Sequence, residues 1–141
     1  MQQLFEFMGN HPLLVAAFAA VLGMLLYTEY TRLFSGIPGL SPYAATQLLN
    51  EGEAVFLDVR DEKEFKTGHI KGARSVPVKD VDKQMHDIEK YKERDVVVYC
   101  DNGMRTSRVT GKLKKQGFTK LNTIAGGLAQ WEKANLPLVS K

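Results

Sequence analysis

The chain contains one cysteine, Cys100, at a position where a thiol is expected to be reactive. It directly follows the apolar run Val96–Tyr99 and precedes a polar loop that contains a glycine. Apolar residues at helical spacing after that loop, Val109 and Leu113, predict a helix. A thiol between a buried strand and a helix N-terminus lies near unpaired backbone N–H groups and the positive end of the helix dipole. Both favour the thiolate, which is the nucleophilic form of cysteine.

The loop that follows the cysteine has the composition of an anion-holding loop. Gly103 permits a positive φ, which can turn several backbone N–H groups inward as an anion-binding nest. Arg105 adds a fixed positive charge, and Thr106 or Ser107 can cap the following helix. The predicted loop therefore consists of Asp101, Asn102, Gly103, Met104, Arg105 and Thr106. A free cysteine can instead be a small buried hydrophobic residue, and this alternative remains open.

Apolar runs alternate with helical patterns along residues 41–138, and the runs lack strict apolar–polar alternation. This is typical of a parallel sheet that is covered by helices on both faces. Sites in such sheets form beyond the carboxyl ends of the strands, and Asp58 and Cys100 both occupy such ends. The predicted strands are residues 54–59, 73–77, 96–99 and 121–124, and the first predicted helix runs from Pro42 to about Asn50, with Ser41 as its cap.

Two residues near the first of these ends, Asp58 and Arg60, are expected to support the site. A carboxylate close to the thiol would oppose its ionisation, so Asp58 is predicted to accept hydrogen bonds from backbone near the loop. Arg60 is predicted to pair with Glu64 and to fix the intervening turn. His69 lies between turn glycines and is predicted to be structural, because one histidine makes no metal site.

The chain resembles a known family in several segments. The segment Cys100–Thr106 is similar to the loop C-x-x-G-x-R-[S/T] of rhodanese-type sulfurtransferases. Further segments are similar to the N-terminal and C-terminal signatures of that family: Leu57–Arg60, Glu64–Phe65, Gly68–Ala73, Val76–Pro77 and Gly126–Trp131. The resemblance implies a rhodanese-like α/β fold, with a central parallel sheet of about five strands and helices on both faces.

The resemblance also implies an activity. The Cys100 thiolate would take the outer sulfur of a small anionic donor such as thiosulfate and become a persulfide. Loop amides of residues 101–105 would hold the sulfur, and Arg105 would contact the sulfonate. An external thiol, a protein or cyanide would accept the sulfur, with no metal or organic cofactor. The alternative is a non-catalytic binding module of the same fold, acting at the membrane. A cysteine phosphatase is disfavoured, because its C-x5-R loop is one residue longer.

The N-terminal part differs from the rest of the chain. From Phe7 to Thr28, 22 residues contain no Asp, Glu, Lys or Arg. As a helix this stretch would be roughly 33 Å long, enough to cross a bilayer core. A signal peptide would have basic residues before the apolar run, and a buried helix would need a larger protein around it. We therefore expect a tail and one transmembrane helix in residues 1–32, with the span at about 8–28, then a linker (33–40) and the rhodanese domain (41–141).

Charge predicts the orientation of this span. The tail before it has no Lys or Arg, whereas Arg32 and a lysine-rich domain follow it. The positive-inside rule then places the N-terminus outside and the domain in the cytoplasm, at the inner membrane if the source is bacterial. A single cysteine agrees with a reducing compartment. The net charge of +3, without interleaved aromatic and basic residues, does not favour nucleic-acid binding.

Overall fold

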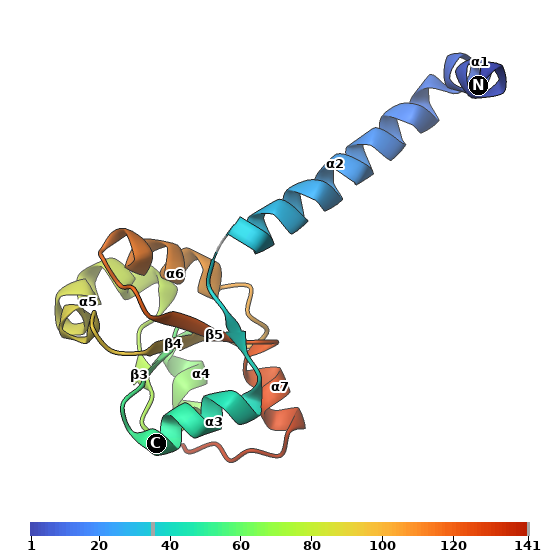
Figure 1. Ribbon diagram of the computed structural model, residues 1–141. Helices are drawn as coiled ribbons and strands as arrows, with labels where there is room; N and C mark the ends of the chain where they lie inside the picture. The colour runs from blue at the N-terminus through green and yellow to red at the C-terminus, as the bar shows by residue number, and fades with distance from the viewer. Residues whose placement is uncertain (35, 141) are drawn as a thin grey trace. The chain divides into compact units, whose positions relative to one another are not determined.

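The computed structural model describes residues 1–34 and 36–140 (Figure 1). The chain forms two compact units, Met1–Gly36 and Ile37–Lys141. Two residues of the predicted boundaries, Ser35 in the linker and Lys141 at the end of the domain, lie outside the described residues.

The N-terminal unit consists of two helices, α1 (Gln2–Asn10) and α2 (Pro12–Phe34). The prediction of one helix over residues 8–28 is wrong at its start, because His11 adopts a non-helical conformation between the two helices. The residue before a proline is disfavoured in the helical region, and proline suits the first position of a new helix. Within α2, the segment Pro12–Tyr30 is long and apolar enough to cross a membrane. Its apolar side chains, such as Leu13 and Phe18, are exposed.

The second unit is built on a five-stranded parallel sheet with the strand order β1-β5-β4-β2-β3. The strands are β1 (Gly39–Leu40), β2 (Val55–Asp58), β3 (Arg74–Ser75), β4 (Val96–Tyr99) and β5 (Leu121–Ile124). The predicted rhodanese-like α/β fold is confirmed. Strands β4 and β5 have the predicted bounds, whereas the last two residues of the predicted linker form the edge strand β1.

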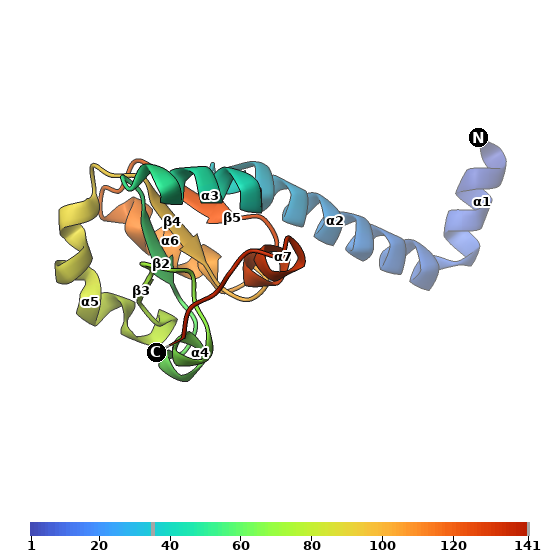
Figure 2. The ribbon, with the colours of Figure 1, turned by 90° about the horizontal axis from the view of Figure 1, so that it is seen from below.

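Both faces of the central strands are buried, which explains their continuous apolar sequence. Val96 and Val98 of β4 join one core cluster together with Cys100, while Val97 and Tyr99 join the other. The first cluster includes residues of α5 (Val81–Ile88) and α6 (Thr106–Lys115), and the second includes residues of α3 (Pro42–Glu51) and α7 (Gly127–Lys133). Figure 2 shows α3 and α7 in front of the sheet, on the side away from α6.

Local sequence signals explain the helix boundaries. Ser41 caps α3, because its hydroxyl accepts a hydrogen bond from the Ala44 N–H at 3.2 Å. Asp61 and Glu64 form a capping box at the start of α4 (Glu62–Thr67), as their spacing predicts. Two short 3-10 helices, η1 (Val78–Asp80) and η2 (Glu89–Tyr91), flank α5.

Candidate functional site

The two strand ends that the sequence singles out lie side by side. Asp58 of β2 is the register partner of Tyr99 of β4, and Cys100 follows Tyr99 directly. The loop of residues 101–105 then leads into α6, which begins at Thr106. The topology therefore places the thiol, the Asp58 carboxylate and the loop at one edge of the sheet, where sites of parallel α/β folds form.

The Cys100 thiol is enclosed by the protein. Its residue has an exposed fraction of 0%, and the Gly103 N–H donates a hydrogen bond to its Sγ at 3.0 Å. Gly103 has a φ of +90°, the left-handed conformation that the loop was predicted to need. The neighbouring N–H of Met104 instead donates to Oδ1 of Asn102 at 3.1 Å. The sulfur thus accepts a hydrogen bond from the Gly103 N–H, as predicted. The Met104 N–H was also predicted to point at the sulfur, but it donates to Asn102. In this structure the thiol has no solvent-accessible surface.

The start of α7 holds the cysteine loop in place. The N–H groups of Leu128 and Ala129 donate to the carbonyls of Cys100 and Asp101 at 2.8 and 2.9 Å. Gly127 has a φ of +64°, and a Cβ atom there would lie 2.5 Å from the Cys100 carbonyl oxygen. Only glycine fits so close to another backbone. We did not assign Gly127 to the site from the sequence, although the Gly126-Gly127 pair was the signal that could have placed it there.

The guanidinium of Arg105 is occupied by two carboxylates. Its Nη1 and Nη2 donate to Oε2 and Oε1 of Glu64, each at 3.2 Å, and Nη2 also donates to Oδ2 of Asp101 at 2.6 Å. Hydrogen bonds from Arg105 lower the pKa of Glu64 below its usual range, so this carboxylate is charged at neutral pH. We missed Glu64 as a site residue, because its partner lies 41 positions further along the chain.

The predicted partner of Arg60 needs correction. Arg60 does not pair with Glu64: its Nη2 donates to Oδ2 of Asp58 at 2.7 Å and to the Gly68 carbonyl at 2.6 Å. As predicted, Asp58 accepts a backbone hydrogen bond, and its donor is the N–H of Arg60 at 2.9 Å. Both residues are buried, with exposed fractions of 0% and 5%. Arg60 reaches the loop through Asp101, since its Nη1 lies 3.6 Å from Oδ1 of that residue.

The remaining predicted residues form the rim and the support of the loop. Met104 is 78% exposed and lies on the rim. Thr106 is buried, and its hydroxyl donates to the Gly103 carbonyl at 2.6 Å, so it stabilises the loop and does not cap α6 through its side chain. The Nδ1 of His69 lies 2.7 Å from the Phe65 carbonyl oxygen, and its ring stacks on Phe65, which fits a structural role.

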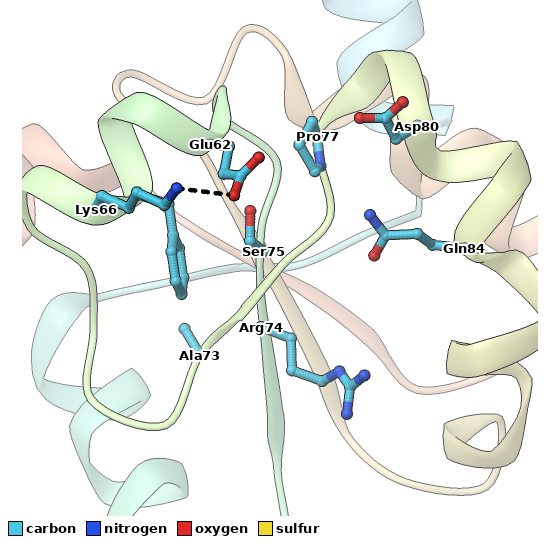
Figure 3. A pocket seen from close by; sticks show the side chains of 9 residues that line it. Glu62, Lys66, Ala73, Arg74, Ser75, Pro77, Asp80 and Gln84 are labelled. Atoms are coloured by element: carbon cyan, nitrogen blue, oxygen red, sulfur yellow. Dashed lines mark ion pairs between the residues drawn. The ribbon is translucent and has the colours of Figure 1, made fainter. Parts of the chain in front are cut away.

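Two cavities lie in this part of the domain. One, of about 350 Å³, is lined by Arg60, Asp101 and residues of α7 such as Leu128. A larger one, of about 470 Å³, lies beside the edge strand β3, with Ser75 between Glu62 of α4 and Gln84 of α5 (Figure 3). Among residues 1–34 and 36–140, no group of three or more His, Cys, Asp or Glu residues is arranged to hold a metal ion.

The sequence matches the rhodanese-like domain family over residues 41–134. Because this match covers most of the chain, and because fold and motifs agree with it, the protein belongs to the rhodanese-like domain family. The match begins at the cap of α3 and ends just after α7, so it comprises the whole sheet except β1 and includes the cysteine loop.

Individual relatives extend the comparison. The uncharacterized protein YibN of Escherichia coli K12 is 33% identical over 140 residues, which are 99% of this chain and 98% of the relative. The rhodanese-like domain of the Anabaena protein Alr3790 has a TM-score of 0.65 and 32% identity, over 74% of this chain and 80% of that one. A thiosulfate sulfurtransferase of Pseudomonas aeruginosa has a TM-score of 0.70 and 25% identity, over 81% of this chain and 22% of that one.

Proposed function

We propose that this protein is a sulfurtransferase that carries a sulfur atom on Cys100 as a persulfide. The observation that carries the proposal is the hydrogen bond from the Gly103 N–H to the Cys100 Sγ at 3.0 Å. A backbone donor aimed at sulfur stabilises negative charge on it. Family membership and the similarity to a thiosulfate sulfurtransferase support the same chemistry.

The reaction has two half-reactions. The Cys100 thiolate attacks the outer sulfur of thiosulfate, the S–S bond of the donor breaks, and its electron pair leaves with sulfite. With an organic persulfide as donor, the electron pair of the S–S bond leaves with the organic thiolate. This thiolate takes up the proton that the outer sulfur of the donor carried. The enzyme persulfide then gives its outer sulfur to cyanide or a thiol, and the Cys100 thiolate is restored.

In this scheme the loop residues Asp101–Thr106 bind the donor. The buried pair of Asp58 and Arg60 supports the loop through the contact of Arg60 with Asp101. Since the chain has one cysteine, the thiol that accepts the sulfur comes from outside it: a small molecule or another protein. The competing hypothesis, a binding module without turnover, predicts no transfer to any acceptor.

Steady-state kinetics test the proposal. Because the donor product leaves before the acceptor reacts, varying thiosulfate at several cyanide concentrations is expected to give parallel double-reciprocal lines. A matching set is measured with a persulfide donor and a thiol acceptor. Lines that intersect would contradict a free persulfide enzyme, and the absence of transfer with every donor would favour the binding module.

We also propose that α2 anchors the protein in a membrane as a single pass, with the N-terminus outside and the rhodanese-like domain in the cytoplasm. The length and apolar composition of Pro12–Tyr30 support an anchor, and the charge distribution around the span supports this orientation.

Deleting residues 2–36 is expected to release a folded, soluble domain, because the sheet and both core clusters lie within residues 37–140. Fractionation of cells is expected to find the full chain in the membrane pellet and the fragment in the supernatant. Full-length protein in the supernatant, or an aggregated fragment, would contradict the anchor.

A further inference from the structure

The arginine of the cysteine loop already contacts two carboxylates. Glu64 contacts Arg105 through both carboxylate oxygens, and Asp101 adds a third contact at 2.6 Å. We propose that Glu64 determines donor specificity: by masking Arg105, it disfavours donors with a charged non-reacting end, such as thiosulfate, and favours persulfides whose organic end is uncharged. This inference rests on the proposed sulfur transfer and names its substrate class.

The charges around the loop support this inference. A continuous series of ion pairs links Arg105 to Asp101, Arg60 and Asp58. Glu64 is the second carboxylate that pairs with Arg105. This set has two guanidinium groups and three carboxylates, so the five side chains together carry one net negative charge. The sulfonate of thiosulfate would approach Arg105 beside the carboxylates of Glu64 and Asp101, which repel it, whereas an uncharged organic group meets no such repulsion.

Glu64 is the carboxylate that can impose this selection, because it is held independently of the loop. Its Oε2 also accepts the backbone N–H of Asp61 at 2.9 Å, as part of the capping box that starts α4. The first turn of α4 thus positions the carboxylate beside Arg105. Asp101, by contrast, belongs to the cysteine loop itself.

The test is the variant Glu64→Gln in the full-length protein. Glutamine can keep the capping-box hydrogen bond but loses the charge. The ratio of kcat/KM for thiosulfate to kcat/KM for 2-hydroxyethyl persulfide is expected to rise about fivefold, the upper range for one partly exposed charge pair. The change should lie in the KM for thiosulfate and not in kcat, because Arg105 would contact the non-reacting end of the donor.

Two further variants make the result specific. Glu62→Gln removes the same charge from the same helix, but Glu62 pairs with Lys66 at 3.1 Å and lines the cavity beside β3 (Figure 3). It should leave the donor ratio unchanged. In an Arg105→Gln background, Glu64→Gln should also leave the donor ratio unchanged, because the guanidinium that Glu64 pairs with is absent.

The outcomes separate this inference from the proposed function. A wild-type protein that accepts sulfur from both donors, with an unchanged ratio in Glu64→Gln, would overturn the inference and leave sulfur transfer intact. An effect that persists without Arg105 would also overturn it. If wild type accepts sulfur from neither donor, the proposed function fails and the inference fails with it. If circular dichroism shows that Glu64→Gln is unfolded, Asp101→Asn serves as the second variant, because it removes the other carboxylate contact of Arg105 and leaves the capping box intact; it should raise the ratio in the same direction.

Discussion

Replacing Cys100 by serine is expected to lower sulfur transfer at least roughly a thousandfold with every donor, as removal of a catalytic nucleophile does in other enzymes. A serine hydroxyl is close in size to the thiol and fits the same enclosed site, so the fold should persist. It is not ionised near neutral pH and cannot hold the transferred sulfur. Rates are measured with thiosulfate and with a persulfide donor, and the fluorescence of the single, buried Trp131 reports whether the domain is folded.

A relocated cysteine provides the matched control for this prediction. In the double variant Cys100→Ser with Asn50→Cys, the chain again has one thiol, now exposed on α3. This variant should be as inactive as Cys100→Ser, because its thiol lacks the Gly103 amide and the surrounding loop. Transfer by either variant at the wild-type rate would mean that the chemistry does not occur at residue 100.

Replacing Arg60 by methionine is expected to destabilise the domain by about 3–5 kcal/mol, because it leaves the buried Asp58 carboxylate without its charged partner. Besides losing the pair at 2.7 Å, the variant leaves the Gly68 carbonyl without the Arg60 hydrogen bond. The free energy of unfolding is measured by urea denaturation of residues 37–141, followed through Trp131 fluorescence.

Two variants control this measurement. Arg108→Met makes the same exchange at an exposed position of α6 and should cost less than about 0.5 kcal/mol. The double variant Asp58→Asn with Arg60→Met removes both charges and should recover much of the lost stability. A loss in Arg60→Met no larger than in Arg108→Met would show that Asp58 does not depend on Arg60.

Features that depend on neighbouring residues could be predicted from the sequence. The bounds of β4 follow from four consecutive apolar residues, and the start of α3 follows from Ser41 and Pro42. The position of Cys100 at a strand end follows from the same local pattern. The helix break before Pro12 also follows from a local rule, since the residue before a proline disfavours the helical conformation. We expected one helix there because no charged residue interrupts the stretch.

Pairings between distant elements could not be predicted in this way. Glu64 lies four residues after Arg60, a spacing that favours a pair only when both residues belong to one helix. Arg60 precedes α4, so its side chain turns back to Asp58 and leaves Glu64 for Arg105. The contact of Gly127 with the Cys100 carbonyl likewise requires the folded sheet, which brings the start of α7 to the end of β4.

The most direct test of the account is the intact mass of the full-length protein after exposure to a persulfide donor or thiosulfate. We expect the mass to increase by one sulfur atom, to return to its original value on addition of cyanide or a small thiol, and to remain unchanged in Cys100→Ser. A wild-type mass that does not change with either donor, or a sulfur that is also added to Cys100→Ser, would contradict the account.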